Sequence, residues 1–402
     1  MVLTIGSNEN YFYMNIIFLT HHDDFVGYSM DRYLNFLSEG MGNRGHTTEV
    51  WNPKPYFSKM NLPENLNKWL RYVDQFVLFP LWFKFKSKAL PKATLFVLVD
   101  QALGMWMPLL QHKKHVVHCH DFIALKSALG NIKENPTSKT GKIYQRLILK
   151  GFSKANCFIS VSKNTQVELV QFLDKQPLLN EQVYNALDPL FVPGDLKLAR
   201  TVVGNHINLD LEQGYILHVG GNDFYKNRVG VIELYDAWRD ITNTSLPLLL
   251  LGYEPADHIK KRYEASPYKN NIHFLVDIKD QLLLKAYQGA GVLVFPSLAE
   301  GFGWPVAEAM AAGCPVITTG EAPMNEVGGT AALYIKRCPS GTGLQAWAKA
   351  SATVLETTIQ LTAQERAALI NKGFANAQRF DGNQILDRLE KIYSEIVNND
   401  NL

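Results

Sequence analysis

Short apolar segments recur along the chain, and stretches with helical spacing of apolar residues separate them. In the first half the apolar segments are 15–19, 48–51, 95–99, 115–119, 157–161 and 182–184. After a polar stretch around 195–213 the pattern starts again with 215–219, 248–251, 272–275, 292–295, 315–318 and 332–335. Strands that alternate with helices form parallel sheets with right-handed crossovers. The pattern therefore predicts an α/β chain with two doubly wound parallel sheets.

The restart of the pattern divides the chain into two predicted domains, over residues 14–199 and 200–380. Residues 381–399 repeat isoleucine and leucine at spacings of three and four, which is typical of one amphipathic helix. Residues 1–13 are polar and show no such pattern. We therefore expect the first folded segment to begin at Met14.

The composition excludes disorder, fibrous repeats and a disulfide scaffold. The chain has 402 residues, of which 47% are hydrophobic and 19% charged, so it can bury a sizeable core. Its four cysteines lack the density of a disulfide framework and the paired spacing of a zinc site. No apolar run reaches the roughly 20 residues of a membrane-spanning helix, and the N-terminus shows no secretory leader. We therefore expect a cytoplasmic protein.

The charge is distributed unevenly between the two halves. Residues 1–200 contain 23 Lys and Arg against 16 Asp and Glu, whereas residues 201–402 contain 17 against 22. A basic first half suits an anionic acceptor or a membrane surface. No motif that reads DNA is present, so we expect no nucleic-acid partner.

A literal G-x-G-x-x-G occurs at residues 40–45, but in the wrong context for a dinucleotide site. The fingerprint needs a strand before it and a helix after it, whereas this one follows a helical stretch and precedes a strand. We interpret it as a glycine-rich helix C-cap. The loop after the first strand holds Gly27, which would let a phosphate approach the backbone. Residues 21–24 cannot readily converge on one ion, and no Asp-x-Asp occurs, so we expect no metal site.

The strongest signal is a strand, a turn and a helix within residues 295–317. Pro305 suits the first helical position, and Gly313 suits a helix stop. The helix N-terminus predicts a site for an anion or for sugar hydroxyls. Its free backbone N–H groups are expected at Gly301, Phe302, Gly303 and Val306. Glu300 and Glu308 bracket this site, although in isolation Glu308 is more typical of a solvated helix carboxylate and Glu300 of one that stabilises a helix dipole.

The segment from Glu300 to Glu308 resembles the Glu-x7-Glu signature of glycosyltransferase family 4, the retaining, nucleotide-sugar-dependent transferases of GT-B fold. Residues 218–227 resemble the family's turn after the first strand of the second domain, with Lys226 at the position of a retained cation. Residues 116–122 resemble the first-domain strand whose final histidine, here His120, reaches the donor sugar; His118 is interpreted as a packed histidine. Further weak matches at 159–162 and 184–188 follow in the family's order, so the resemblance covers most of the chain.

The resemblance implies a GT-B enzyme with two Rossmann-like domains facing across a cleft. The second domain would hold the donor and the first the acceptor, and the helix at 381–399 would cross back to the first domain. The implied reaction moves a sugar from a nucleoside-diphosphate sugar to a saccharide or lipid-linked saccharide, with retention of anomeric configuration. Such a hexosyltransferase would act in polysaccharide or glycoconjugate assembly.

The resemblance also implies roles for individual residues. The catalytic residues would be His120, Glu300 and Lys226. Lys226 would neutralise the donor diphosphate, Glu300 would lie by the transferred sugar, and Glu308 would bind the ribose hydroxyls. The donor-binding residues would be Gly27, Gly221, Lys226, Arg228, Ile278, Gly301, Phe302, Gly303, Val306 and Glu308. Arg228 would compensate for a cation that the family commonly places at Gly221. Cations and a helix end would thus replace a metal, and no cofactor is expected.

Residues 68–92 fit no core pattern, because they carry six cations, one carboxylate and seven aromatic residues. Basic residues beside Trp and Phe suit a segment that lies in a lipid headgroup layer. A pair of helices with core aromatics and solvated lysines fits equally well. The segment is therefore a candidate for peripheral contact with the inner face of a membrane.

Other functions remain open at this level. A GT-B epimerase or phosphorylase would share the nucleotide cleft without transferring a sugar to an acceptor. A catalytically silent binding subunit is less consistent with the sequence, because both carboxylates, the lysine and the histidine are in place.

Overall fold

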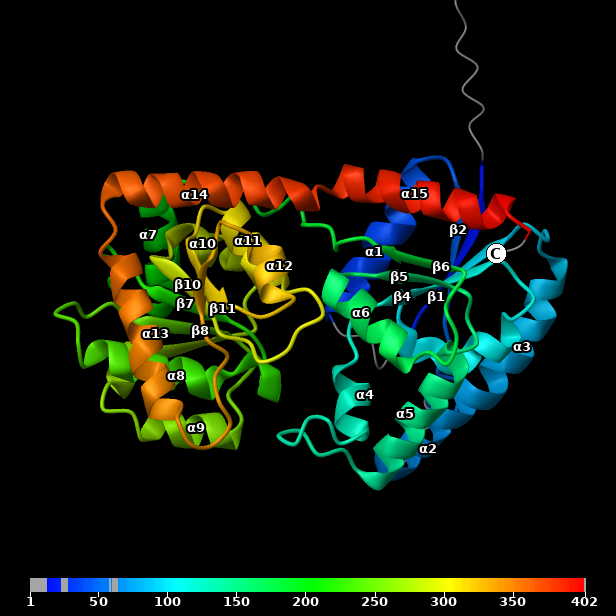
Figure 1. Ribbon diagram of the computed structural model, residues 1–402, viewed down its shortest axis with the longest axis horizontal. Coiled ribbons are helices and arrows are strands. Elements are labelled where there is room, and N and C mark those ends of the chain that lie inside the picture. The colour runs from blue at the N-terminus through cyan, green and yellow to red at the C-terminus, as the bar shows by residue number, and fades with distance from the viewer. Residues whose placement is uncertain (1–12, 23–27, 58, 60–63, 401–402) are drawn as a thin grey trace, which may run out of the picture.

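The computed structural model describes residues 13–22, 28–57, 59 and 64–400, which form two parallel sheets lying side by side (Figure 1). Within these residues each sheet has six strands, in the orders β2-β1-β3-β4-β5-β6 and β12-β11-β10-β7-β8-β9. The strands of the first sheet are β1 (Asn15–Leu19), β2 (Thr47–Trp51), β3 (Leu95–Leu98), β4 (His115–Cys119), β5 (Cys157–Ser160) and β6 (Leu179–Gln182). Those of the second are β7 (Ile216–Val219), β8 (Leu248–Gly252), β9 (Ile272–Val276), β10 (Val292–Phe295), β11 (Val316–Thr319) and β12 (Leu333–Ile335). The predicted doubly wound α/β architecture is confirmed.

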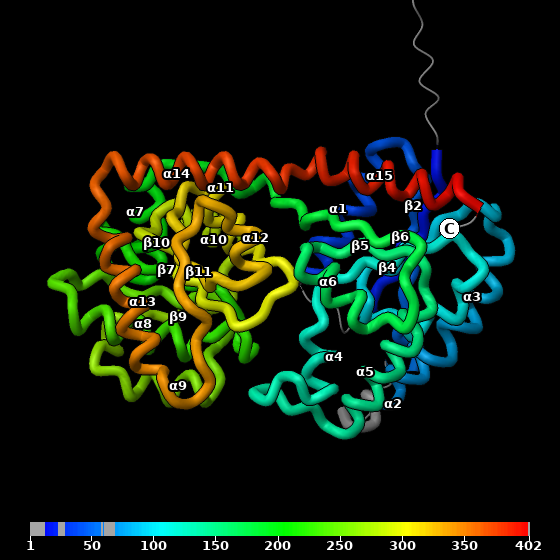
Figure 2. Tube along the Cα trace, in the orientation of Figure 1, coloured from blue at the N-terminus to red at the C-terminus, as the bar shows by residue number. Residues whose placement is uncertain are grey.

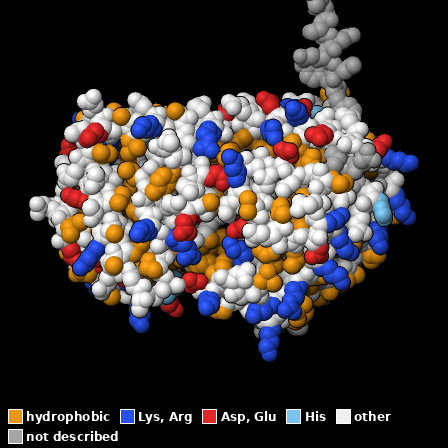
Figure 3. All heavy atoms as spheres, viewed as in Figure 1, with side chains coloured by type: hydrophobic (Ala, Val, Ile, Leu, Met, Phe, Trp, Pro, Cys, Tyr) orange, Lys and Arg blue, Asp and Glu red, His pale blue; other side chains and the backbone are white. Residues whose placement is uncertain are grey.

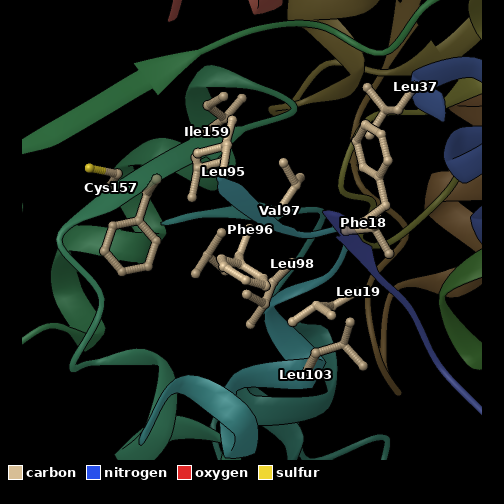
Figure 4. Packing of buried hydrophobic residues seen from close by; sticks show 14 of the residues in the cluster. Phe18, Leu19, Leu37, Leu95, Phe96, Val97, Leu98, Leu103, Cys157 and Ile159 are labelled. Carbon is tan, nitrogen blue, oxygen red and sulfur yellow. The ribbon is translucent and has the colours of Figure 1, made fainter. Parts of the chain in front are cut away.

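Helices cover both faces of each sheet, which is why the central strands are mostly apolar. All four side chains of β3 are buried, and Figure 4 shows them packed among Phe18, Leu19 and Leu103. In the first half the helices are α1 (Tyr28–Asn43), α2 (Glu64–Val73), α3 (Phe79–Lys86), α4 (Ile123–Ala128), α5 (Lys139–Phe152) and α6 (Lys163–Phe172). The others are α7 (Leu196–Ile207), α8 (Arg228–Arg239), α9 (Asp257–Glu264), α10 (Asp280–Gly289), α11 (Trp304–Ala311), α12 (Met324–Gly328), α13 (Leu344–Ile359), α14 (Ala363–Ala377) and α15 (Gly382–Asn398). Short 3₁₀ or π turns are η2 (Asp74–Leu78), η3 (Ser87–Ala89), η4 (Gln101–Leu109), η5 (Phe224–Lys226), η6 (Lys269–Asn271) and η7 (Gln378–Phe380).

The last helix returns to the first half of the chain. After α14 the chain turns through η7, and α15 then lies along α1 and β3, as both ribbon and tube show (Figures 1 and 2). Leu386 packs so closely on Gly40 that a Cβ there would lie 2.6 Å from it. The Tyr393 hydroxyl and His118 Nε2 are 2.9 Å apart. The end of the chain therefore completes the core of the first half, while the predicted domain bounds at 199/200 and 380/381 stay predictions.

Two local predictions differ from the structure. The strand predicted at 182–184 lies at Leu179–Gln182 instead, because this edge strand is polar and only one of its four residues is buried, so no apolar run marks it. The glycine-rich motif is a C-cap only at Gly45, which follows α1 with a φ of +91°. Gly40 and Gly42 lie inside α1. Gly40 packs there against the end of the Leu386 side chain.

Candidate active site

The carboxyl ends of strands from both sheets meet at one place, where ligands of open parallel sheets bind. The loop between β10 and α11 touches the end of β4. A Cβ at Gly301 would lie 2.0 Å from the His120 carbonyl oxygen, so only glycine permits this approach. Thr165 Oγ1 lies 3.1 Å from the same carbonyl and 3.3 Å from that of Gly301. The predicted donor-side loop and the predicted histidine strand are therefore adjacent.

Lys226 and Glu300 form an ion pair at this place. Lys226 Nζ donates to both carboxylate oxygens of Glu300, at 2.8 and 3.0 Å. The side chains are 18% and 9% exposed, so little water screens the pair. Ser297 Oγ lies 2.6 Å from Glu300 Oε1. Two residues that lie 74 positions apart, both predicted as catalytic, are thus in direct contact.

The turn before α11 presents unused backbone donors. Among the described residues, the N–H groups of Gly301, Phe302 and Gly303 have no hydrogen-bond acceptor. Gly303 has a φ of +102°, and a Cβ there would meet Met324 at 2.5 Å. The prediction for Val306 is wrong, because its N–H donates to the Gly303 carbonyl at 3.1 Å. The Val306 N–H is therefore used within the first turn of α11, and the unused donors of residues 301–303 precede the helix.

Glu308 is buried on α11 and has two partners. Arg32 Nη1 lies 2.6 Å from Oε1, and the Tyr287 hydroxyl donates to Oε2 at 3.0 Å. Burial raises the pKa of the Glu308 carboxyl, and the opposing effects of Arg32 and Tyr287 are smaller. The sequence analysis missed Arg32, because one arginine on a predicted helix looks like any solvated charge.

The other predicted donor-binding residues differ in their placement. Gly221 lies beside Tyr253, whose ring would be 3.1 Å from a Cβ at Gly221. Ile278 is partly buried in the loop between β9 and α10 and packs on the core of the second half. Gly27 lies outside the described residues.

Arg228 is buried rather than presented at an open surface. It donates to Asn222 Oδ1 at 2.8 Å and to the Tyr253 carbonyl at 2.9 Å, and it lies over the Phe274 ring. Burial lowers its pKa to about 10. Its Nη1 thus joins the two loops beside Gly221, whereas its Nε and Nη2 are buried without a hydrogen-bond partner among the described residues. The donor-binding role of Arg228 stays a prediction.

Histidines and an aspartate occupy the ends of three neighbouring strands in the first sheet. His120 Nε2 donates to the Val99 carbonyl at 2.9 Å, and burial lowers its pKa. His21, after β1, lies 2.8 Å from Asp100, after β3. Burial would raise the pKa of Asp100, but hydrogen bonding and charge from His21, together with His120, lower it on balance.

His118 lies deeper in the same sheet and is a packed histidine, as predicted. It is fully buried between the Tyr33 and Tyr393 hydroxyls, and burial lowers its pKa to about 3. In the part of the chain that the structure describes, no three His, Cys, Asp or Glu side chains are grouped closely enough to hold a metal ion.

A groove of about 1070 Å³ runs along the junction of the two halves. Its walls include Arg32, Asp188 and Trp304, together with the turn between α14 and α15. Lys226 and Glu300 do not line this groove. The Arg32–Glu308 contact therefore lies beside the groove, whereas the Lys226–Glu300 pair belongs to the meeting point of the strand ends.

Residues 205–341 match the protein family described as Glycosyl transferases group 1. The chain is similar to O-antigen chain mannosyltransferase B of Escherichia coli, with 34% identity over 123 residues, which are 30% of this chain and 32% of that protein. It is also similar to O-antigen chain mannosyltransferase RfbU of Salmonella typhimurium, with 25% identity over 201 residues, or 50% and 52% of the two chains. The similarity thus spans about a third to a half of these relatives.

Solved structures match almost the whole chain. Sucrose-phosphate synthase of Thermosynechococcus elongatus has a TM-score of 0.72 at 19% identity, covering 96% of this chain and 99% of that one. HepE of Anabaena, solved in complex with UDP and glucose, has a TM-score of 0.68 at 16% identity, covering 95% and 100%. At these identities the likeness shows the fold. The chain therefore has the GT-B fold, and its residues 205–341 match the model of glycosyl transferases group 1.

Proposed function

We propose that the protein is a retaining glycosyltransferase that uses a nucleoside-diphosphate sugar and a saccharide or lipid-linked saccharide acceptor. The observation that supports this most is the Lys226–Glu300 pair beside the free N–H groups of residues 301–303. A partly buried cation and unused backbone donors form a site for a diphosphate and its sugar. The family match over the same residues supports the assignment.

The chemistry follows from the charge that develops when the donor breaks. The C–O bond between the sugar and the diphosphate cleaves through an oxocarbenium-like state, and the acceptor oxygen attacks on the face that the diphosphate leaves. The acceptor proton passes to the departing diphosphate. Lys226 and the N–H groups before α11 stabilise that anion. His120 and Glu300 contact the transferred sugar, and Glu308 binds the ribose.

The names of the relatives support the class of substrate. Both are mannosyltransferases of O-antigen chains, which favours a hexose donor and a role in polysaccharide or glycoconjugate assembly. HepE was solved with UDP and glucose, which supports a nucleotide-sugar donor for this fold.

Slow hydrolysis of one nucleotide sugar in the absence of acceptor is the expected result of incubating the protein with a donor panel in EDTA. Water would replace the acceptor. Activity in EDTA is expected because Lys226 and the backbone N–H groups, rather than a metal ion, are proposed to stabilise the diphosphate. Released sugar and nucleoside diphosphate are measured by chromatography. Hydrolysis that appears only after manganese or magnesium is restored would contradict metal independence. Conversion of the donor to another nucleotide sugar would instead identify an epimerase.

We further propose that helices of the first half contact a membrane. Consecutive helices α2, η2 and α3 form one helical rod, on which Trp69, Val77, Leu81 and Phe85 are exposed. Phe85 is 81% exposed, whereas Phe79 and Phe83 are in the core, so the rod has an apolar outer face as well as a buried one. The side chain of Lys68 lies outside the described residues.

Charges on this outer face suit an anionic surface. Lys84 and Lys88 are exposed, and the single carboxylate of residues 69–92, Asp74, is buried. Lys86 is partly exposed; it pairs with Glu49 at 2.9 Å and lies over the Trp51 ring. The core alternative from the sequence thus describes one side of the rod, and our proposal assigns the other side to the membrane. Among the described residues no helix meets the length and hydropathy of a membrane span.

Helix α5 extends the same surface. It packs beside the rod through Tyr144, which contacts Tyr72 and Phe76. Its exposed side combines Ile143 and Leu147 with cations, and the helix contains no carboxylate. These cations are Lys139, Lys142, Arg146 and Lys150. Figure 3 shows Lys and Arg gathered over this corner of the molecule, with hydrophobic atoms between them. A cytoplasmic enzyme with this surface would meet lipid-linked acceptors on the inner leaflet.

Weak, salt-sensitive binding to vesicles that contain anionic lipid is therefore expected. Each cation near such a surface contributes about 1 kcal/mol, and salt screens the attraction. Replacing Lys84, Lys88, Lys142 and Arg146 by Gln should abolish sedimentation with vesicles and leave donor hydrolysis unchanged. Lys349→Gln with Lys372→Gln, exposed on α13 and α14, is the matched control. A parent protein that ignores anionic vesicles at low salt would contradict the membrane contact.

A further inference from the structure

Arg32 links the two halves of the molecule through the carboxylate of Glu308. Arg32 lies on α1 and Glu308 on α11, 276 positions later in the chain. The Arg32 guanidinium is held over the Phe191 and Trp304 rings, and its Nε lies 3.8 Å from Asp188. Rings on two sides and two carboxylates fix the orientation of this side chain more tightly than a surface ion pair would.

The environment of Glu308 makes this contact chemically important. Its side chain is only 5% exposed, and a buried carboxyl without a cation favours the neutral form. A neutral carboxylic acid carries a proton on one oxygen and loses acceptor capacity, whereas an ionised carboxylate accepts at both oxygens. With Arg32 on Oε1 and Tyr287 on Oε2, each oxygen of the ionised group keeps a second acceptor position.

We propose that Arg32 is a positioning residue for the nucleotide, which keeps Glu308 ionised and oriented so that it can accept hydrogen bonds from the ribose hydroxyls. This inference rests on the proposed function, in which Glu308 binds the ribose. Because Arg32 belongs to the first half, the ribose site of the second half is complete only when the two halves are in contact. The first half thus contributes to donor binding as well as to acceptor binding.

The proposal predicts a pH dependence whose sign is fixed. Among the residues that the structure describes, the charged or titratable groups that face Glu308 are Arg32 from α1, Tyr287 from α10 and Asp188 from the linker. Replacing Arg32 by Met removes the cation and leaves the carboxylate of Asp188, so the pKa of Glu308 rises. A group with a raised pKa becomes neutral as the pH falls. The variant should therefore bind nucleotide progressively less well toward acidic pH, relative to the parent.

The experiment is a calorimetric titration with UDP, GDP and ADP between pH 5.5 and 8.5. For the nucleotide that the parent binds best, Arg32→Met should weaken binding at least about tenfold at pH 8 and more at pH 6. Arg32→Lys, which keeps the charge, should restore most of the pH profile. Arg44→Met is the matched control, because Arg44 pairs with Glu390 of α15 at 3.1 Å, away from this site.

The outcomes separate the inference from the function on which it rests. If Glu308→Gln binds nucleotide as the parent does, the ribose role of Glu308 fails. If Glu308→Gln binds weakly while Arg32→Met keeps the parent's affinity and pH profile, the positioning role of Arg32 is wrong. Should Arg32→Met fail to fold, Tyr287→Phe is the second variant, because the Tyr287 hydroxyl also lowers the pKa of Glu308. This variant should show a smaller loss of nucleotide affinity, and the loss should also grow toward acidic pH. An unchanged profile in that variant would overturn the proposal.

Discussion

Lys226→Ala is expected to lower kcat/KM for sugar transfer at least about tenfold. In our proposal Lys226 contacts the donor diphosphate, whose charge grows as the sugar departs. A charge-assisted hydrogen bond contributes about 1.5–3 kcal/mol, and about 1.4 kcal/mol corresponds to a factor of ten in rate. The variant also leaves Glu300 without its cation, which adds repulsion toward the diphosphate. Steady-state kinetics with the donor identified from the panel provide the measurement.

A matched variant distinguishes this effect from the general loss of an ion pair. Lys269 pairs with Glu264 at 2.7 Å. Lys269 lies in η6, directly before β9, and so at the amino end of that strand, whereas the candidate site lies at the carboxyl ends of the strands. Lys269→Ala should keep the parent's kcat/KM. Both variants should unfold at temperatures close to that of the parent. An unchanged kcat/KM in Lys226→Ala would remove Lys226 from the diphosphate site.

Glu308→Ala and Glu300→Ala are expected to have different effects. Glu308→Ala should weaken binding of the free nucleoside diphosphate, because the ribose loses its acceptor. Glu300→Ala should leave that binding nearly unchanged and lower the rate of transfer, because Glu300 is assigned to the sugar. Calorimetric titration measures the binding, and transfer assays measure the rate.

The ion pair between Glu300 and Lys226 also predicts the direction of any change in nucleotide affinity in Glu300→Ala. Removing Glu300 frees Lys226 to meet the diphosphate alone, so any change in nucleotide affinity should be toward tighter binding. Equal losses of nucleotide affinity in both variants would contradict the division of roles between the two carboxylates.

Much of the fold was predictable from the sequence, because buried parallel strands are short apolar runs. Most of the predicted strands match to within one or two residues. The exception, β6, is a polar edge strand, on which the hydrophobic pattern carries no signal. Residues 381–399 were predicted as a helix from spacing alone. Its return to the first half could be inferred only from the family resemblance.

The parts of the candidate site that lie within one short sequence motif could be predicted. Contacts between residues that are distant in the sequence could not. Glu300 and the turn that follows it form one continuous motif in the sequence, so the position of this turn before a helix could be predicted. Arg32 is distant from that motif in sequence, so its contact with Glu308 had no local signal. Arg228 was predicted as an available cation, but packing on Phe274 buries it.

The rod of α2, η2 and α3 illustrates a different limit. Composition shows that residues 68–92 are both aromatic and basic, but it does not assign each aromatic to a side. Helical geometry separates Phe83, which faces the core, from Phe85, which faces outward. The interpretation as core helices therefore describes the side of Phe83, and the side of Phe85 is the one that the proposed membrane contact would use.

Proton NMR of the donor incubation tests the central claim most directly. With the donor that the panel identifies and a saccharide acceptor, the anomeric proton of the newly formed glycoside reports the configuration of the transferred sugar. Our account predicts transfer with the same anomeric configuration as in the donor. An inverted glycoside would contradict the retaining mechanism, and the absence of sugar release from every nucleotide sugar tested would contradict the assignment as a glycosyltransferase.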